Sequence, residues 1–127
     1  MPRQIIHTTE APAAIGPYSQ AVRCGNTVYL SGQIPICPQT QRAVDDSVDA
    51  QIHQVLRNLK AVAEAAGGNL SQVAKLNAYL TDLADTPRLN AIMDEYFQAP
   101  YPARAAVQVA GLPKGFRVEI EAILVLD

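Results

Sequence analysis

The chain has 127 residues, of which 49% are hydrophobic and 17% are charged, as expected for one globular domain over residues 1–127 and not for a disordered chain. Its formal net charge of −2 supplies no basic field for neutralising many phosphates, so nucleic-acid binding is not expected. No segment approaches the roughly 20 apolar residues of a membrane helix, and the N-terminus lacks the apolar core of a signal peptide, so we expect a cytoplasmic location.

Two short strands joined by a tight turn are predicted at residues 20–24 and 27–31. Gly25-Asn26 separates them and can supply the positive φ angle that two-residue hairpin turns require. Residues 32–40 contain two prolines and show no regular period, so we expect a loop that leaves the sheet there.

The strongest helical pattern in the chain begins at Val48. Apolar residues recur at helical spacing, namely Val48, Ile52, Val55, Leu56, Leu59, Val62, Ala63 and Ala66. Asp45, Asp46 and Ser47 can cap the N-terminus of this helix, and Gly67-Gly68 can end it in a left-handed conformation. The pattern therefore predicts a helix with both ends marked.

A strand and a second helix are predicted next. Residues 73–80 alternate, with Ala74, Leu76, Ala78 and Leu80 on one face and Val73, Lys75, Asn77 and Tyr79 on the other. The second helix is expected to start after a cap at Asp85 or Thr86 and to end before Pro100. Its buried stripe consists of Leu89, Ile92, Met93, Tyr96 and Phe97.

The last two strands are predicted at residues 103–109 and 117–126, with a turn-rich connection at 111–115. The order of elements is then ββαβαββ. This order favours the α+β class, in which both helices cover one face of a single mixed sheet.

The second face of this sheet is expected to be buried as well. In the last strand Val118, Ile120, Ala122, Leu124 and Leu126 share one face, while the other combines Arg117, Glu119 and Glu121 with Ile123 and Val125. The side of the preceding strand that carries Arg104 is mostly small and apolar. Because two helices cover only one face, the residual apolar surface predicts an oligomer interface, unless a loop or terminal strand folds over it.

Arg104 and Glu119 are the first candidates for chemistry, because charges in strand-like apolar segments need a partner or a ligand. The guanidinium of Arg104 can hold a carboxylate with two parallel hydrogen bonds. Glu119, or Glu121 on the same strand face, can orient or deprotonate a water. The alternatives are a structural ion pair for Arg104 and a solvated or salt-bridged strand edge for the glutamates. Tyr18 and Ser31 are weaker candidates, since packing or turn formation also explains them.

Other kinds of site lack support in the sequence. Cys24, Cys37, His7 and His53 have neither metal-ligand nor redox-pair spacing, so we expect unpaired thiols and no metal site. Neither a nucleophile–histidine set nor a phosphate, dinucleotide or cofactor-lysine motif is present.

Five blocks of sequence, in order along the chain, resemble one known family. They are residues 16–21 (GPYSQA), 31–35 (SGQIP), 54–62 (QVLRNLKAV), 101–104 (YPAR) and 118–123 (VEIEAI). From about Ile6 to Val125, the chain closely resembles the RidA/YjgF family of reactive intermediate deaminases. The resemblance implies a chorismate-mutase-like α+β fold. It also implies a homotrimer whose sheets form a central barrel with the helices outside, and ligand sites between the subunits.

The resemblance further implies hydrolysis of short-lived enamine and imine acids to 2-oxo acids and ammonia, without a cofactor. Such acids, including 2-aminoacrylate, 2-iminopropanoate and 2-iminobutanoate, arise when pyridoxal-phosphate enzymes dehydrate serine or threonine. Arg104 matches the residue that holds the substrate carboxylate, and Glu119 matches the residue that positions the attacking water. The pocket positions matched by the resemblance are Tyr18, Ser31, Gly32, Asn90 and Ala106, the last of which is cysteine in many relatives.

Two other functions remain open at this stage. The pocket could bind small carboxylic acids such as 2-oxobutanoate without turnover, although a pure binder has no use for the water-positioning Glu119. Some eukaryotic relatives act as ribonucleases or translation inhibitors. The acidic balance and the lack of a basic, aromatic-rich surface argue against that activity here.

Overall fold

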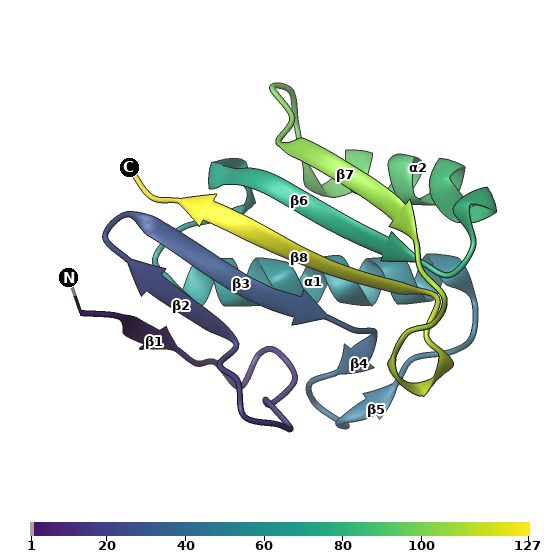
Figure 1. The fold of residues 1–127 in the computed structure, drawn as a ribbon, viewed down its shortest axis with the longest axis horizontal. Helices are drawn as coiled ribbons and strands as arrows, with labels where there is room; N and C mark the ends of the chain where they lie inside the picture. The colour runs from purple at the N-terminus through teal and green to yellow at the C-terminus, as the bar shows by residue number, and fades with distance from the viewer. Residues whose placement is uncertain (1) are drawn as a thin grey trace.

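The computed structural model describes residues 2–127 as a six-stranded mixed sheet with two α-helices on one face (Figure 1). The sheet strands are β1 (Gln4–Ile6), β2 (Ala21–Cys24), β3 (Thr27–Gln33), β6 (Val73–Leu80), β7 (Ala103–Gln108) and β8 (Val118–Val125). Their spatial order is β1-β2-β3-β8-β6-β7, and β6 and β7 run parallel. The helices are α1 (Val48–Ala65) and α2 (Thr86–Tyr96). The predicted α+β class and the placement of both helices on one face are therefore confirmed.

The predicted N-terminal hairpin is present. Cys24 pairs with Thr27 across the two-residue turn, and Gly25 has a φ of 61°. The sequence pattern missed β1, which has only three residues and buries only Ile6. It also missed β4 (Ile36–Cys37) and β5 (Arg42–Ala43), a small hairpin within and beyond the segment predicted as a loop.

The two predicted ends of α1 are also present. The Ser47 side chain accepts a hydrogen bond from the amide of Ala50 at 3.1 Å. At the other end Gly67 has a φ of 93°, and the amide of Gly68 donates to the carbonyl of Ala63 at 3.0 Å. These contacts satisfy backbone groups that a helix otherwise leaves without partners. The apolar stripe of α1 packs on the sheet and forms part of the core.

Two details of the second half of the chain differ from the prediction. Asp85 precedes α2, but its side chain makes no capping bond there, because it accepts hydrogen bonds from Arg117 instead. In β6 a register shift between Val73 and Lys75 places Val73 in the core and leaves Ala74 exposed, the reverse of strict alternation. A β-bulge inserts one extra residue and so exchanges the two faces locally. From Lys75 onward the predicted alternation holds.

The face of the sheet that carries Arg104 was assigned wrongly. Arg104 pairs with Leu76 and Ala106 pairs with Ala78, and both partners point into the helix-covered core. Arg104 therefore lies on the helix side, at the edge of the sheet. The register of β7 against β6 decides this, and a short strand of small residues does not disclose that register.

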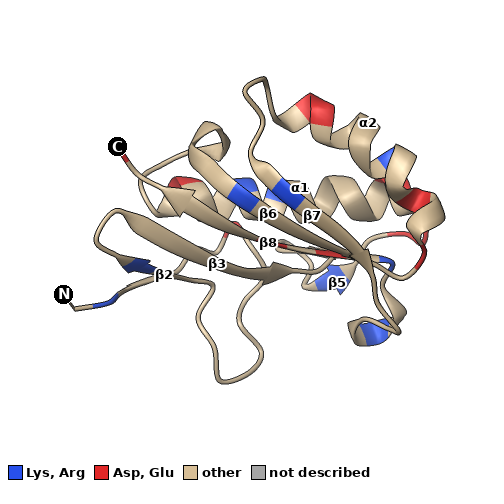
Figure 2. Cartoon of the chain, turned by 45° about the horizontal axis from the view of Figure 1, so that its top comes forward, with Lys and Arg blue, Asp and Glu red and all other residues tan. Residues whose placement is uncertain are grey.

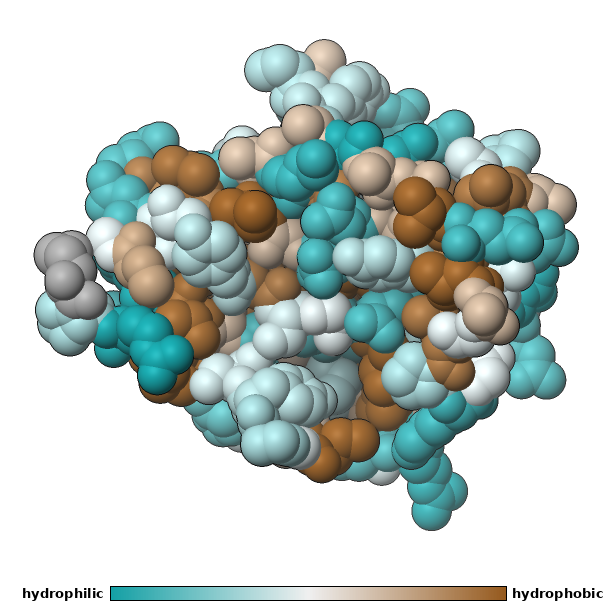
Figure 3. All heavy atoms as spheres, viewed as in Figure 1, coloured by the Kyte–Doolittle hydropathy of each residue, from teal (hydrophilic) through white to brown (hydrophobic). Residues whose placement is uncertain are grey.

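The opposite face of the sheet is not covered by any helix of residues 2–127 (Figure 1). Tyr29, Val107 and Val125 remain 52%, 45% and 43% exposed there. Figure 3 shows this face with hydrophobic and hydrophilic residues intermixed. The terminal strand β1 extends the edge of the sheet beside β2 and does not cross the face. We call this surface the open face. None of the helices in residues 2–127 has the length and hydropathy needed to cross a membrane.

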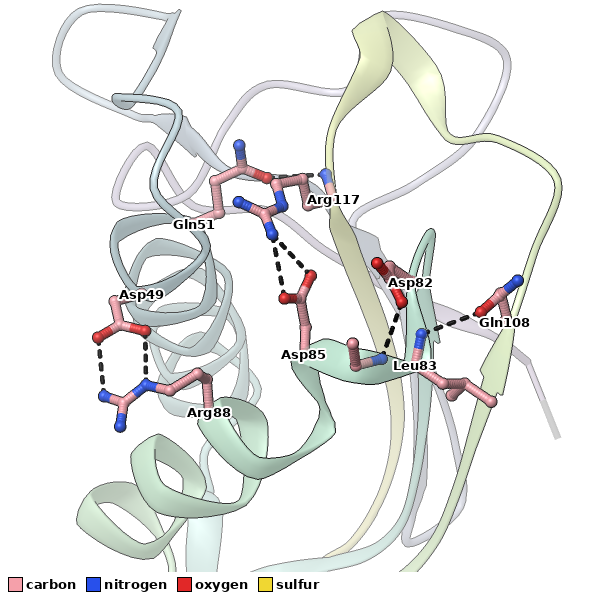
Figure 4. A network of polar contacts seen from close by, with 9 residues as sticks. Asp49, Gln51, Asp82, Leu83, Asp85, Arg88, Gln108 and Arg117 are labelled. Carbon is pink, nitrogen blue, oxygen red and sulfur yellow. Dashed lines mark hydrogen bonds and ion pairs between the residues drawn. The ribbon is translucent and has the colours of Figure 1, made fainter.

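An ion pair ties the start of β8 to the segment before α2 (Figure 4). The Arg117 guanidinium donates to the two carboxylate oxygens of Asp85 at 3.0 and 3.1 Å, and the Arg117 amide donates to the Gln51 side chain on α1 at 2.8 Å. The Asp85 side chain is only 11% exposed, whereas Asp49, which pairs with Arg88, is 45% exposed. Two aspartate–arginine pairs of the same chain therefore differ chiefly in burial.

We expect Asp85→Ala to lower the free energy of unfolding by about 1–2 kcal/mol, because it removes a hydrogen-bonded partner from a partly buried guanidinium. Asp49→Ala is expected to cost no more than about 1 kcal/mol, because solvent screens an exposed pair. Chemical denaturation at one fixed protein concentration compares the two variants. Equal losses of unfolding free energy in the two variants would contradict the larger contribution that we assign to the less exposed Asp85 pair.

Candidate functional site

Arg104 lies on the edge strand β7 with its guanidinium turned toward α2. Its Nη1 donates to the Asn90 side-chain oxygen at 2.6 Å and lies 3.6 Å from the sulfur of Met93. Within residues 2–127, Arg104 forms no ion pair, and its Nε and Nη2 make no hydrogen bond. The structural ion pair considered as an alternative is therefore absent from the described chain, and most of the donor fork is available to a ligand.

A cavity of about 390 Å³ opens beside this guanidinium. It is lined by Asn90, Met93, Asp94, Tyr101, Pro102 and Arg104. Asn90, which was predicted as a site residue, accepts a hydrogen bond from Nη1 of Arg104. The Nε and Nη2 donors can still form two hydrogen bonds to a carboxylate. We call this space the Arg104 cavity.

Glu119 lies on β8, on the open face, where it pairs across the strands with Tyr79. Its carboxylate rests against the backbone of Gly32, at an irregularity in the pairing of β3 with β8. A Cβ atom added to Gly32 would overlap Oε2 of Glu119 and lie 3.0 Å from its Cδ. Glycine therefore permits the close approach of this carboxylate to the β3 backbone.

The surroundings of Glu119 disfavour its charge. Burial, and secondly the negative charge of Glu121, raise the pKa of Glu119 above its ordinary value of 4.5. Glu121 itself accepts a hydrogen bond from the Asn77 side chain at 3.1 Å. Burial, and secondly Glu121, also raise the pKa of Tyr79, so its phenol stays protonated at neutral pH. A carboxylate with a raised pKa is a stronger proton acceptor once it is ionised.

Tyr18 and Ser31 lie on the same side of the sheet as Glu119. Both line a hollow of about 400 Å³ on the open face, together with Asn77 and Glu121. The Ser31 hydroxyl donates to the Ser19 carbonyl at 2.5 Å, so its proton is engaged while its oxygen can still accept. Tyr18 is 52% exposed. These side chains form a shallow surface and not an enclosed pocket.

The predicted site residues thus fall into two groups on opposite faces of one sheet. Arg104, Asn90 and Ala106 lie on the helix side, where Ala106 packs against the core. The members of the second group are Tyr18, Ser31, Gly32 and Glu119. One chain therefore does not bring Arg104 and Glu119 to a common ligand.

Some residues of the Arg104 cavity were not identified from the sequence as site residues, namely Met93, Asp94, Tyr101 and Pro102. One usable signal was present, since Asn90 and Asp94 are one helical turn apart and share a face of α2. In residues 2–127, no cluster of three or more His, Cys, Asp or Glu side chains could hold a metal. Cys24 and Cys37 are unpaired, as predicted.

Known proteins resemble this chain over almost its entire length. The model of the family described as endoribonuclease L-PSP matches residues 8–126. The 2-iminobutanoate/2-iminopropanoate deaminase of Dermatophagoides farinae is 49% identical over 126 residues, which cover 99% of this chain and 98% of that protein. The mouse protein of the same name is 49% identical over 123 residues, covering 97% and 91% of the two chains.

Solved structures agree with these sequence relatives. RidA from a Psychrobacter species superposes with a TM-score of 0.94 at 54% identity, covering 97% of this chain and 99% of that one. Escherichia coli TdcF, solved with bound serine, superposes with a TM-score of 0.93 at 45% identity, covering 98% and 99%. The chain therefore belongs to the endoribonuclease L-PSP family, the RidA/YjgF family of reactive intermediate deaminases.

Proposed function

We propose that this protein is an imine deaminase. Its substrates are 2-iminopropanoate, with its enamine form 2-aminoacrylate, and 2-iminobutanoate, and its products are 2-oxo acids and ammonia. The observation that carries the proposal is the guanidinium of Arg104, which faces a cavity and has no carboxylate partner in residues 2–127. This exposed guanidinium has free donors with which to bind an anionic ligand, and relatives about half identical to this chain are named for these two imino acids.

The active form in this proposal is a homotrimer whose open faces line a central barrel. Two observations support it: the open face retains exposed apolar side chains, and Arg104 and Glu119 lie on opposite sides of their sheet. In the trimer Arg104 and Asn90 of one subunit face Glu119 of the partner subunit, with Tyr18, Ser31 and Gly32 beside it. Each site then belongs to two chains.

The chemistry requires positioning and one proton acceptor. Arg104 holds the substrate carboxylate, which fixes the imine carbon in front of a water held by Glu119. The water oxygen bonds to that carbon while Glu119 takes one proton from the water, and Glu119 then gives this proton to the nitrogen, which yields a neutral carbinolamine. Glu119 next transfers the hydroxyl proton of the carbinolamine to the nitrogen in the same way, and the nitrogen leaves as ammonia. The carbon–oxygen double bond of the 2-oxo acid forms as the carbon–nitrogen bond breaks. Imines hydrolyse unaided in water, so a few tenfold gains of about 1.4 kcal/mol each are sufficient.

The substrates would come from enzymes that dehydrate serine or threonine with pyridoxal phosphate, which places the protein beside them in the cytoplasm. TdcF, a relative, was solved with serine bound. The serine bound to TdcF supports a ligand of similar size and charge for the present protein. No cofactor has a role in the mechanism.

The direct test generates 2-iminobutanoate from an amino acid with an amino-acid oxidase and traps it competitively with semicarbazide. The wild-type protein is expected to reduce semicarbazone formation and to speed the appearance of 2-oxobutanoate. Binding of 2-oxobutanoate without acceleration of any imino acid would show a carboxylate-binding module instead of an enzyme.

The rate is expected to fall at acid pH, because Glu119 accepts a proton only when it is ionised. The midpoint of this fall lies above pH 4.5, since burial and Glu121 both raise the pKa of Glu119. Glu121→Gln removes the charge but can still accept the bond from Asn77, so it should move the midpoint to lower pH. Catalysed rates are compared after subtraction of the spontaneous reaction. An unchanged midpoint in the variant would argue against Glu119 as the group that titrates.

Ribonuclease activity, which the description of the family also suggests, has little support in the surface charges. Figure 2 shows positive and negative residues interspersed over the strands and helices, and the net charge is −2. Phosphate backbones are bound by clustered positive residues. Salt-dependent RNA binding would reveal such an activity if present.

A further inference from the structure

The Arg104 cavity contains a second charged group that the proposed hydrolysis does not use. Asp94, on α2, lines the cavity, and its Oδ1 accepts a hydrogen bond from the Tyr101 hydroxyl at 2.6 Å. This bond and the charge of Asp94 raise the pKa of Tyr101 above its ordinary value of 10.0, so the phenol remains a donor at neutral pH. The Asp94 carboxylate is therefore held at the cavity by a neutral group and keeps its own charge uncompensated.

Arg104 and Asp94 share this cavity without pairing. No ion pair joins them within residues 2–127, and the guanidinium is bonded instead to Asn90, one helical turn before Asp94. Side chains four residues apart on a helix have Cβ atoms about 6 Å apart. Because Asn90 holds the guanidinium, Asp94 lies about one helical turn further along the same cavity wall.

A carboxylate bound to Arg104 brings the rest of its molecule against the remaining cavity wall. That wall offers the thioether of Met93, the ring of Pro102 and the pair formed by Tyr101 and Asp94. An uncharged chain finds apolar surface there. A chain that ends in a second carboxylate meets the negative charge of Asp94 and finds no second cation among the lining residues.

We propose that Asp94 sets the charge selectivity of the Arg104 cavity, which accepts 2-imino and 2-oxo acids with uncharged side chains and disfavours those with a second carboxylate. The proposal rests on the proposed function only in that Arg104 holds the ligand carboxylate. If the second carboxylate of a ligand lies about 6 Å from the Asp94 carboxylate at a partly hydrated surface, their repulsion weakens binding by roughly three- to tenfold. Because Asp94 is exposed to solvent, this penalty should shrink as salt is added.

Calorimetric binding of two 2-oxo acids of similar length tests the proposal. The probes are 2-oxohexanoate, which has an uncharged end, and 2-oxoglutarate, which has a second carboxylate, each measured at low and at high salt. The proteins compared are the wild type, Asp94→Asn and Asp94→Lys. Glu95→Gln is the matched control, since it removes the same charge from the next residue, which does not line the cavity. Arg104→Ala shows that both probes bind at this cavity.

The wild type is expected to prefer 2-oxohexanoate. Asp94→Asn should reduce that preference by roughly three- to tenfold at low salt, and Asp94→Lys should reduce it further or reverse it. Glu95→Gln should leave it unchanged. A preference that does not depend on the charge at position 94, or probes whose binding survives Arg104→Ala, would overturn the proposal. Calorimetry measures binding and not catalysis, so its result on charge selectivity does not depend on whether the protein hydrolyses imines.

Discussion

Arg104→Ala is expected to lower kcat/KM for 2-iminobutanoate by about 10²- to 10³-fold. Hydrogen bonds to a charged partner contribute about 1.5–3 kcal/mol each, and the free fork of Arg104 offers two to a substrate carboxylate. Because the carboxylate also fixes the position of the imine carbon, we expect both a higher KM and a lower kcat. The semicarbazide competition assay measures both constants.

Arg88→Ala is the matched control for this variant. Arg88 is also an arginine near α2, but its guanidinium already pairs with Asp49 at 2.7 Å on the surface. We expect its removal to leave the kinetic constants unchanged. Arg104→Lys should fall between alanine and wild type, because lysine restores the charge but not the planar fork. Near-wild-type activity of Arg104→Ala would exclude the assigned role.

Glu119→Gln is expected to lower kcat by about 10²- to 10⁴-fold with little change in KM, since a general base contributes in the transition state and not to substrate binding. Glutamine has nearly the same shape as glutamate, so its side chain can still pack against Gly32 and hold a water. It cannot accept a proton from that water. Glu64→Gln, an exposed position on α1, serves as the control for loss of one negative charge.

Stability separates this effect on catalysis from damage to the fold. The pKa of Glu119 is raised in the folded protein, so the native state holds its proton more tightly than the unfolded state. Ionisation of Glu119 therefore costs stability as the pH rises through its folded pKa. Glutamine escapes this cost, so Glu119→Gln should be at least as stable as wild type at neutral pH. A variant that is inactive and also unfolds at lower denaturant would leave the loss of activity without a catalytic interpretation.

The sequence predicted those features that depend on local spacing. The alternation of β8 placed Val118, Ile120 and Leu124 in the core and Glu119 on the other face, as the structure shows. The cap at Ser47 and the left-handed Gly67 followed from the residue types that helix ends require. Such features need no knowledge of distant partners.

Features that depend on tertiary pairing could not be predicted in this way. The face of the sheet on which Arg104 lies follows from the register of β7 against β6. The Asp85 side chain does not cap α2 as predicted, because it pairs with Arg117, which is 32 residues away. The residue types of the site were visible in sequence, because Arg104 and Glu119 are charges in apolar strands. Their separation to opposite faces was not visible, and it is the reason why we propose a site that is shared between two subunits.

The most direct test of this shared site mixes two variants that are each inactive. Arg104→Ala and Glu119→Gln are co-expressed with different tags, and the hybrid oligomers are purified and assayed beside each variant alone. If every site combines Arg104 of one subunit with Glu119 of the partner subunit, each purified hybrid trimer contains one intact site in three. Sedimentation of the same samples reports whether they are trimers. We predict about a third of wild-type activity in the purified hybrids, whereas hybrids no more active than either variant alone would contradict the shared site.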